Sequence, residues 1–314
     1  MKAVICTKYG PPEVLEFREI QKPIPRDHEV LIKNYATTVH IGDTKIRAFK
    51  PGMGAVKDFF FQPIMRFMIG FWGPRKNILG MELAGGVEQI GKSVTRYKTE
   101  DQVFASTDLN FGAYAEYVCL SEDSIMGKKP ENMSYGEAAT VPNGALTALY
   151  VLRKANIQME QKVLIYGASG SVGTFAVQIA KYLGAVVTGV CSTSNMEMVK
   201  MLGADEVLDY TREDFTMHVG YYDVIFDAVG KAEYSSTKSA LKGTGIYLNV
   251  LTSSSGLKLK IEDLNFLVSL IESGHLRTVI DREYSFDQMI EAHRYVDSGH
   301  KKGNVVIRVS EPDL

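Results

Sequence analysis

The stretch from residue 162 to residue 191 constrains the fold of this chain more than any other. It begins with a short apolar run, Val163 to Ile165, of the kind that is buried in a parallel sheet. A turn with three glycines follows, and behind it apolar residues recur at helical spacing until a second apolar run at 186–190. The pattern predicts a strand, a glycine-rich turn, a helix and a returning strand. Such a unit can hold a dinucleotide by its pyrophosphate.

The turn at 167–173 supplies the residues that we expect to contact the pyrophosphate. Glycines allow a tight turn and a close approach of phosphate to backbone, and the N-terminus of the next helix offers N–H groups and a positive dipole end. The usual fingerprint begins with Gly where this chain has Ala168, so the flanking strands and helix carry the prediction. The alternative is a strand-to-helix turn without a ligand. The candidate contacts are Gly167, Ala168, Ser169, Gly170, Ser171, Val172 and Gly173.

Length and composition bound the remaining alternatives. With 314 residues the chain is long enough for two domains, and a net charge of −2 provides no basic field for nucleic acid. The N-terminus starts with strand-like residues and lacks the apolar core of a signal peptide. Three dispersed cysteines form neither a disulfide framework nor a metal-ligand pattern, as in a reducing compartment. We therefore expect a cytoplasmic protein.

A strongly apolar segment at 59–72 needs a separate interpretation. It is interrupted by Gln62, Pro63 and Arg66 and is shorter than the ~20 residues of a spanning helix, so we expect no membrane span. Two interpretations stay open: a core or subunit-contact segment, and an apolar lid over a substrate pocket. Substrate specificity is expected to be set within 44–77.

The pattern of elements changes along the chain. The first 120 residues read as strands separated by turns, and a capping-box pattern at Ser134 to Glu137 predicts a helical stretch from there to Ala155. Strands then alternate with helices, which is typical of a parallel sheet covered on both faces. The first strands are expected at 2–7, 14–20, 29–38, 82–90, 101–105 and 112–120. The later strands are expected at 162–166, 186–190, 206–208, 223–227 and 246–250, with helices at 171–183, 195–202 and 233–241.

After residue 250 the regular alternation of strands and helices stops. We expect a helix near 262–273, a strand at 279–281, a helix at 286–297 and a last strand from Val305 to Val309. An interrupted domain accounts for this order. We expect one domain from 1–125 and 257–314, and a nucleotide-binding domain at 126–256.

Five segments, taken together, are similar to a known family. They are ILGMELAGGVEQIGKSVTRYKTEDQVFAS (78–106), GAYAEYV (112–118), AATVPNGALTAL (138–149), GASGSVG (167–173) and EAHRYVDSGHKKGNVVI (291–307). They resemble the medium-chain dehydrogenase/reductases, and most of all the zinc-independent, quinone oxidoreductase-like branch that includes zeta-crystallin. The resemblance implies an α/β protein with a GroES-like β-rich catalytic domain, a Rossmann domain with a doubly wound parallel sheet, and an active-site cleft at their junction.

The residues argue against zinc. Zinc catalysis needs thiolate and imidazole ligands with an open coordination position. Where the zinc-dependent branch has His, this chain has Met81, and its first cysteine ligand is absent from 38–43. A structural zinc would need four clustered cysteines, and the chain has three dispersed ones. We predict no metal.

Cofactor choice follows from the residues after the second apolar strand. An NAD site usually has Asp or Glu there to bind both ribose hydroxyls, but here no acid precedes Glu197. Ser192 and Thr193 can bind a 2′-phosphate without repelling it, which favours NADP(H). Relatives often have a basic residue near the positions where this chain has Ser194 and Asn195. Lys200 is close in sequence, with a solvated lysine as its alternative interpretation.

The resemblance carries further cofactor contacts onto this chain. They are Tyr210 near the 2′-phosphate, Thr147 at the nicotinamide end, Val229 and Leu251 after strands that face the cleft, and Asn304 near the C-terminus. Taken alone, Thr147 reads as a helix residue bonded to its own backbone, and Gly230, beside Val229, as a turn residue.

Hydride transfer without a metal needs few catalytic side chains, because the nicotinamide carries the hydride and the fold positions the acceptor. A quinone or an α,β-unsaturated carbonyl can accept hydride, and a proton can follow from water or a side chain. The resemblance places His40 and Asp43 beside nicotinamide and substrate; their alternatives are a satisfied turn histidine and a helix cap. We expect an NADPH-dependent reductase of a small apolar quinone or enone. The alternatives are an enoyl-thioester or activated-alkene reductase, and a low-turnover NADPH-binding partner protein.

One departure from the family bears on assembly. Relatives carry a longer segment with another apolar strand, which often pairs across a dimer interface, where this chain has only 252–260 before the helix near Glu262. Either 257–261 supplies a short sixth strand, or the sheet ends early. A homodimer through that edge is therefore an open alternative.

Overall fold

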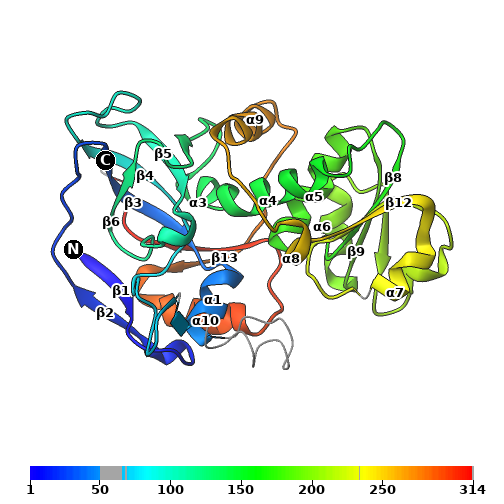
Figure 1. Ribbon diagram of the computed structural model, residues 1–314, viewed down its shortest axis with the longest axis horizontal. Coiled ribbons are helices and arrows are strands. Elements are labelled where there is room, and N and C mark those ends of the chain that lie inside the picture. Colours follow the sequence, from blue (N-terminus) through cyan, green and yellow to red (C-terminus); the bar gives the residue numbers. More distant parts are fainter. Residues whose placement is uncertain (50–65, 68, 233, 313–314) are drawn as a thin grey trace. The chain divides into compact units, whose positions relative to one another are not determined.

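The computed structural model describes residues 1–49, 66–67, 69–232 and 234–312 (Figure 1). The chain divides into two compact units: Met1–Pro142 with Ile280–Leu314 form the first, and Asn143–Val279 form the second. The first unit is thus built from both ends of the chain. Both divisions fall later in the sequence than the boundaries expected at 125/126 and 256/257.

Hydrogen bonds explain where these divisions lie. Strand β7 (Met126–Lys128) pairs with β5 (Gln102–Ser106), which keeps the chain after residue 125 in the first unit. Nε2 of Gln178 donates to the carbonyl oxygen of Arg277 at 2.9 Å, and Oε1 of Gln178 accepts from the backbone amide of Arg277 at 2.9 Å. These bonds keep the chain as far as Val279 in the second unit.

The first unit is built on a seven-stranded sheet of order β13-β14-β3-β4-β5-β7, with β6 paired to β3. All of its pairings are antiparallel except that of β13 with β14. Two further strands, β1 (Lys2–Cys6) and β2 (Leu15–Glu19), form a separate antiparallel pair. The other strands are β3 (Glu29–Thr38), β4 (Glu82–Ile90), β6 (Tyr117–Ser121), β13 (Ile280–Ser285) and β14 (Asn304–Arg308).

Among the described elements, the helices that accompany this sheet include α1 (Ile41–Ala48), α3 (Tyr135–Ala139) and α10 (Met289–Asp297). The capping box predicted at Ser134 is confirmed, since its hydroxyl accepts from the amide of Glu137 at 3.2 Å and its own amide donates to the Glu137 carboxylate at 2.8 Å. Buried Arg47 of α1 donates to Asp297 of α10 at 2.5 Å, which holds these two helices together.

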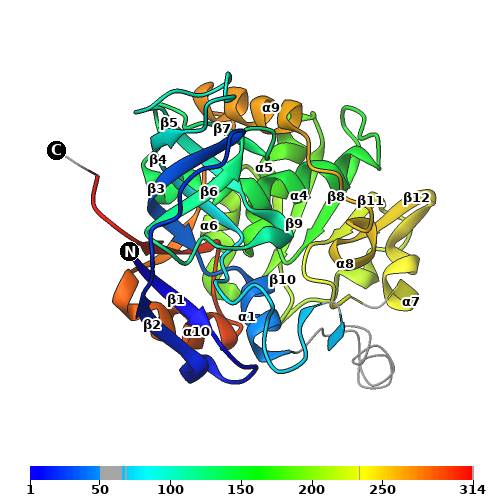
Figure 2. The same ribbon diagram turned by 60° about the vertical axis from the view of Figure 1, so that its left-hand side comes forward.

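The second unit contains a five-stranded parallel sheet of order β10-β9-β8-β11-β12. Figure 2 shows β8, β11 and β12 side by side in that order. The strands are β8 (Lys162–Tyr166), β9 (Val186–Cys191), β10 (Glu206–Asp209), β11 (Tyr222–Asp227) and β12 (Leu241–Asn249). The helices are α4 (Val141–Arg153, whose first two residues fall in the first unit), α5 (Ser171–Tyr182), α6 (Met196–Met201), α7 (Tyr234–Thr237), α8 (Val250–Ser253) and α9 (Ile261–Glu272). Val163, Leu164 and Ile165 are all fully buried in β8, as a strand at the centre of a parallel sheet requires.

The structure shortens one expected strand and decides between the two alternatives for 257–261. The strand expected at 112–120 begins only at Tyr117, because Gly112 has a φ of +103° and the amide of Tyr114 turns back to the carbonyl oxygen of Leu79 at 2.9 Å. Residues 257–261 form no strand; they lead into α9. Of the two alternatives for this segment, the sheet ending early is therefore confirmed, with β12 as its last described strand.

Most of the apolar segment 59–72 lies outside the described residues, as does much of 44–77. The interpretations of the first as a core, subunit-contact or lid segment, and of the second as the specificity region, stay predictions. Within the described ranges, no helix combines the length and apolar character needed to cross a membrane.

Candidate functional site

The candidate residues of the second unit follow the carboxyl ends of its parallel strands. In the sheet register Tyr166 lies opposite Val190 and Asp227, and Asp227 lies opposite Asn249. The turn at 167–173 therefore begins beside the ends of β9 and β11. Because β9 and β10 extend to one side of β8 and β11 and β12 to the other, the turn lies where the strand order reverses, which is where open α/β sheets bind ligands.

Two of the three turn glycines are required by close packing. Gly167 has a φ of +78°, and a Cβ atom there would stand 2.1 Å from Cγ2 of Val229. A Cβ atom at Gly173 would stand 2.1 Å from the carbonyl oxygen of Gly167, so the first turn of α5 can approach the end of β8 only without a side chain.

Gly170 has a different environment. It is the N-cap of α5, and the nearest atom to a Cβ placed there is the carbonyl oxygen of Gly167 at 3.5 Å, an ordinary contact distance. No packing in the described structure thus demands glycine at this position. The first-turn amides of α5 lack partners within the helix, and an anion could reach them over Gly170. Among the remaining turn candidates, Ala168 is fully buried, whereas Ser169, Ser171 and Val172 are partly exposed.

A buried carboxylate organises the neighbouring loop. Asp227, at the end of β11, accepts hydrogen bonds from the amides of Val229 at 3.0 Å, Gly230 at 2.8 Å and Ala232 at 2.8 Å. It also accepts from the side chain of Asn249 at 3.1 Å, which in turn receives the amide of Leu251 at 2.9 Å. This network presents the half-exposed side chain of Val229 beside Gly167 and that of Leu251 beside Gly230.

The residues expected at the ribose end lie after β9 and β10. The Ser192 hydroxyl accepts from the side chain of Asn195 at 3.1 Å and lies 3.4 Å from the Ser194 hydroxyl. The hydroxyl of Thr193 instead donates to the carboxylate of Asp209, and Tyr210 is exposed. The hydroxyl proton of Thr193 is therefore used in its bond to Asp209 and is not available to a phosphate.

Asp209 is a residue that sequence reasoning did not find. Besides Thr193, it accepts from the hydroxyl of Thr211 at 2.7 Å and its amide at 2.9 Å, and these bonds hold the pKa of its carboxyl below the usual range. Asp209 is the last residue of β10, and no sequence motif marks it as part of the site. Only the pairing of β10 with β9 brings it beside Thr193.

Thr147 lies on α4 and is partly exposed. Its hydroxyl makes no hydrogen bond with any described residue, so the alternative interpretation, a bond to its own helix backbone, is not met in that part of the chain.

In the first unit, His40 and Asp43 form the start of α1. His40 is its N-cap, with Nδ1 accepting from the amide of Gly42 at 3.0 Å, and Asp43 accepts from the amide of His40 at 3.1 Å. Both side chains therefore cap α1, which is the alternative given above for Asp43, and the Nδ1 atom of His40 has the partner that its own alternative, a satisfied turn histidine, requires. Because Nδ1 is an acceptor, the network assigns the ring proton to Nε2. Burial lowers the pKa of His40 to about 4, so the ring is neutral at pH 7.

Asp43 also binds the segment before β4. Its carboxylate accepts from the amide of Gly80 at 3.1 Å and is hydrogen-bonded to the hydroxyl of buried Tyr114. Burial raises the pKa of Asp43 to about 7, against these hydrogen bonds, which favour the charged form. Tyr114 in turn lies 3.1 Å from Nε2 of fully buried His293, whose pKa burial lowers to about 3.

Three strands bring further polar groups toward His40. Thr38, near the end of β3, pairs with Val306 of β14 and donates to the buried Glu82 at the start of β4. Lys301, just before β14, donates to the carbonyl oxygen of Gly303 at 2.7 Å and acts electrostatically on both His40 and Glu82. Burial lowers the pKa of Lys301 to about 8. Sequence reasoning missed Lys301 because more than 200 residues separate it from His40 and only the β3–β14 pairing joins them. Asn304, the first residue of β14, is buried.

The donor set of this region does not fit zinc. Among the described residues, no three His, Cys, Asp or Glu side chains gather as metal ligands. Gly42 has both Nδ1 of His40 and Sδ of Met81 at 3.0 Å from the position of a Cβ atom, so the thioether of Met81 lies beside the imidazole. A thioether is a poor ligand for zinc, which prefers thiolate, imidazole and carboxylate.

The chain is similar to known proteins over most of its length. Residues 26–131 match the model of the alcohol dehydrogenase GroES-like domain, and residues 202–261 and 251–307 match that of the zinc-binding dehydrogenase. The 2-methylene-furan-3-one reductase of Solanum lycopersicum is 30% identical over 98% of this chain and 79% of its own length. The chloroplastic NADPH-dependent alkenal/one oxidoreductase of Arabidopsis thaliana is 28% identical over the same shares. A solved quinone oxidoreductase from Coxiella burnetii is 29% identical over 99% of both chains, with a TM-score of 0.84.

Proposed function

Because this chain belongs to the medium-chain dehydrogenase/reductase family, in its quinone oxidoreductase-like branch, we propose that it is an NADPH-dependent reductase of quinones or α,β-unsaturated carbonyls. The observation that carries the proposal is the glycine-rich turn between β8 and α5, at the point where the strand order reverses. The names of the relatives support the reaction class, since they include an alkenal/one oxidoreductase and a quinone oxidoreductase.

The turn fits the pyrophosphate of a nicotinamide dinucleotide. Glycine at 170 leaves open space in front of the α5 amides, where a side chain would stand in the way of a phosphate. Val229 and Leu251, held by the Asp227 and Asn249 network, would contact the cofactor with their exposed apolar side chains.

The preference for NADPH rests on the segment after β9. Ser192 and Asn195 present neutral polar groups there, and the nearby carboxylate of Asp209 is occupied by three hydrogen bonds from Thr193 and Thr211. A 2′-phosphate can bind Ser192, Asn195 and exposed Tyr210 without meeting a free carboxylate. Ribose hydroxyls alone would find no acidic partner in Ser192, Asn195 or Tyr210, which disfavours NADH.

The nicotinamide supplies the hydride when NADPH is bound, and the acceptor takes that hydride and one proton. In this chain His40 is neutral and carries its proton on Nε2, so it can donate a hydrogen bond to the acceptor's carbonyl oxygen. Lys301, with a pKa of about 8, is an ammonium at pH 7 and can supply the proton. Asp43 would hold the His40 loop through the α1 cap and the Gly80 amide.

Loss of NADPH absorbance with three acceptors tests the proposal: 9,10-phenanthrenequinone, a 2-alkenal and crotonyl-CoA. We expect turnover with the quinone or the alkenal, and a higher kcat/KM with NADPH than with NADH. NADPH binding without turnover of any acceptor would contradict the proposed activity. Preferred use of NADH would contradict the cofactor assignment alone.

A further inference from the structure

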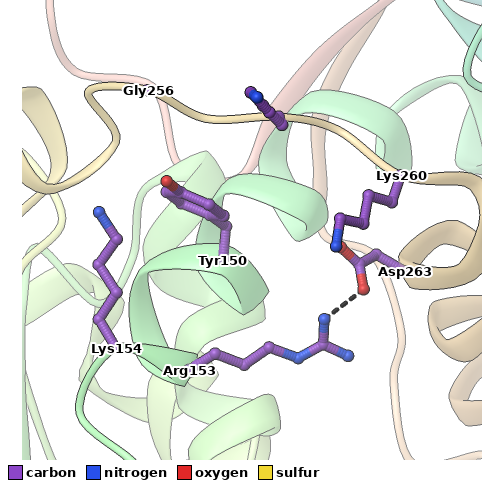
Figure 3. A pocket seen from close by; sticks show the side chains of 7 residues that line it. Tyr150, Arg153, Lys154, Gly256, Lys260 and Asp263 are labelled. Carbon is purple, nitrogen blue, oxygen red and sulfur yellow. Dashed lines mark hydrogen bonds and ion pairs between the residues drawn. The ribbon is translucent and has the colours of Figure 1, made fainter.

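The second unit also contains a basic pocket, separate from the glycine-rich turn. This cavity of about 410 Å³ lies between the end of α4 and the segment that leads into α9 (Figure 3). A cavity of this size suits a small-molecule ligand. The side chains that line it are Tyr150, Arg153, Lys154, Lys258, Lys260 and Asp263. None of them is among the candidate contacts of the dinucleotide.

The pocket is strongly positive although the chain as a whole has a net charge of −2. Its lining has four cationic side chains and one carboxylate, that of Asp263, which leaves an excess of three positive charges. Asp263 is paired with Arg153, and Figure 3 shows this ion pair as a dashed line. In the part of the chain that the structure describes, Lys258 and Lys260 take part in no ion pair.

Helix α4 accounts for two of these cations. Arg153 and Lys154 stand at its C-terminal end, where positive charge stabilises the helix dipole. Lys154 is also held in place, since its Nζ donates to the carbonyl oxygen of Ser253 at 2.5 Å and lies 4.6 Å from the ring centroid of Tyr150. Local stability therefore explains why these two residues are basic.

Helix α9 does not account for the other two cations. Lys260 is its N-cap and makes no side-chain capping bond, and Lys258 precedes it by two residues. A helix N-terminus is the positive end of the dipole, so cations there are unfavourable, and Ser, Thr, Asp or Asn would cap it better. Glu262 and Asp263 in the first turn offset this only in part, since Asp263 is shared with Arg153. An anion held between α4 and α9 would remove the conflict.

We propose that this pocket binds the diphosphate group of a small organic ligand. The negative charges of two adjacent phosphates can be neutralised by the three uncompensated positive charges, and Arg and Lys are the usual partners of phosphate oxygens. Tyr150 supplies an aromatic wall for the organic part of the ligand. The diphosphate could belong to the tail of a thioester acceptor or to a free nucleotide, and the chemistry of recognition is the same for both.

Calorimetric titration with inorganic pyrophosphate tests the site. NADP⁺ is kept saturating, so that the glycine-rich turn cannot take up the titrant. We expect one binding event that weakens at least tenfold in the double variant Lys258→Gln/Lys260→Gln, and weakens with added NaCl because the cations are exposed. The control is Lys181→Gln/Lys242→Gln, which removes the same charge from ion-paired lysines outside the pocket and should bind as the wild type does. Absence of binding to the wild type, or equal binding by the pocket variant, would overturn the proposal.

Kinetics and ADP binding distinguish the two sources of the diphosphate. A tenfold rise in KM for crotonyl-CoA in the pocket variant, with KM for crotonaldehyde unchanged, assigns the diphosphate to the acceptor. Unchanged KM values with weakened ADP binding assign it to a free nucleotide. The pyrophosphate titration needs no turnover, so it decides the pocket even where the proposed reductase activity fails.

Discussion

A Cβ atom at Gly173 would stand 2.1 Å from the carbonyl oxygen of Gly167, whereas one at Gly170, three residues earlier, would meet nothing closer than 3.5 Å. Two glycines of one turn are thus under different constraints. Gly173 is required because α5 packs closely against the end of β8. Gly170 has no close neighbour and lies where a phosphate would bind.

This difference predicts separable effects of two alanine substitutions. Gly173→Ala should lower the free energy of unfolding by about 2 kcal/mol or more, because backbone atoms must move to admit the methyl group. Gly170→Ala should leave stability within about 1 kcal/mol of the wild type but weaken NADPH binding at least tenfold. Urea unfolding and fluorescence titration with NADPH measure the two effects. Wild-type NADPH affinity in Gly170→Ala would contradict the placement of the pyrophosphate.

The hydroxyls of Ser192 and Thr193 should contribute unequally to cofactor preference. Ser192→Ala removes a hydroxyl that can donate to a 2′-phosphate, and should lower kcat/KM for NADPH about tenfold, the size expected for a bond to a charged group, while that for NADH is unchanged. Thr193→Val removes no donor that is available to the phosphate, and Asp209 keeps its two bonds from Thr211, so the NADPH to NADH ratio should fall less than in Ser192→Ala, by about threefold at most. The reverse order of the two effects would contradict the assignment.

His40 combines a capping role with a proposed contact to the acceptor, and asparagine can separate the two. Asn is a good N-cap, so His40→Asn should keep the free energy of unfolding within about 1 kcal/mol of the wild type. It removes the Nε2 proton of the imidazole, and kcat with a quinone or enone should fall about tenfold, equal to the loss of about 1.4 kcal/mol of transition-state stabilisation. Unchanged kcat in a stably folded variant would end the proposed role of His40.

Lys301 should set the alkaline limb of the pH profile. Its ammonium form, the proton donor, is present below a pKa of about 8 and is lost above it, so kcat/KM should fall as the pH rises through about 8. Lys301→Met should remove this limb and lower the rate at pH 7 about a hundredfold, the lower end for general acid catalysis. Lys302→Met, a substitution at the exposed neighbour, is the matched control and should behave as the wild type. Retention of the limb in Lys301→Met would assign it to another group.

His293 should make the free energy of unfolding decrease as the pH falls. Its pKa is about 3 in the folded protein against an ordinary value of 6.5, so below pH 6.5 only the unfolded chain takes up the proton and stability is lost. His40 acts in the same direction, whereas Asp43, with a raised pKa of about 7, acts in the opposite one. From pH 6.5 to pH 5 the His293 contribution is about 2 kcal/mol.

The variant His293→Leu isolates this contribution. The free energy of unfolding, from urea titrations at the two pH values, should fall by about 2 kcal/mol more in the wild type than in the variant on going from pH 6.5 to pH 5. A difference that does not change with pH would show that the folded protein protonates His293 as readily as the unfolded chain does.

Much of the fold could be predicted because its signals are local. The strands at 29–38 and 82–90 were predicted with the bounds that the structure has, since apolar alternation and flanking turn residues mark both. The capping box at Ser134 and the run from β8 to β9 were found for the same reason. Strand β7 was missed because Met126–Lys128 is too short to show a period, and only its pairing with β5 makes it a strand.

The candidate site was predictable only in part. The turn glycines stand together in the sequence, but their different constraints depend on Val229 and on the start of α5, which folding brings near. Lys301 and Asp209 carry no local pattern; each acquires its surroundings from strand pairing across the chain. Burial then shifts the pKa values of His40, Asp43 and Lys301, and burial of a polar group cannot be read from its neighbours in sequence.

The early end of the parallel sheet leaves β12 with β11 as its single described neighbour. An open strand of this kind usually invites another strand to add to it. Here Gly243 and Gly245 weaken the strand, the pairing with β11 is irregular near Tyr222, and Lys242 adds a charge at the rim. These features make β12 a poor template for the addition of a further strand. A longer insert at 252–260 would have to overcome these features before it could add a sixth strand.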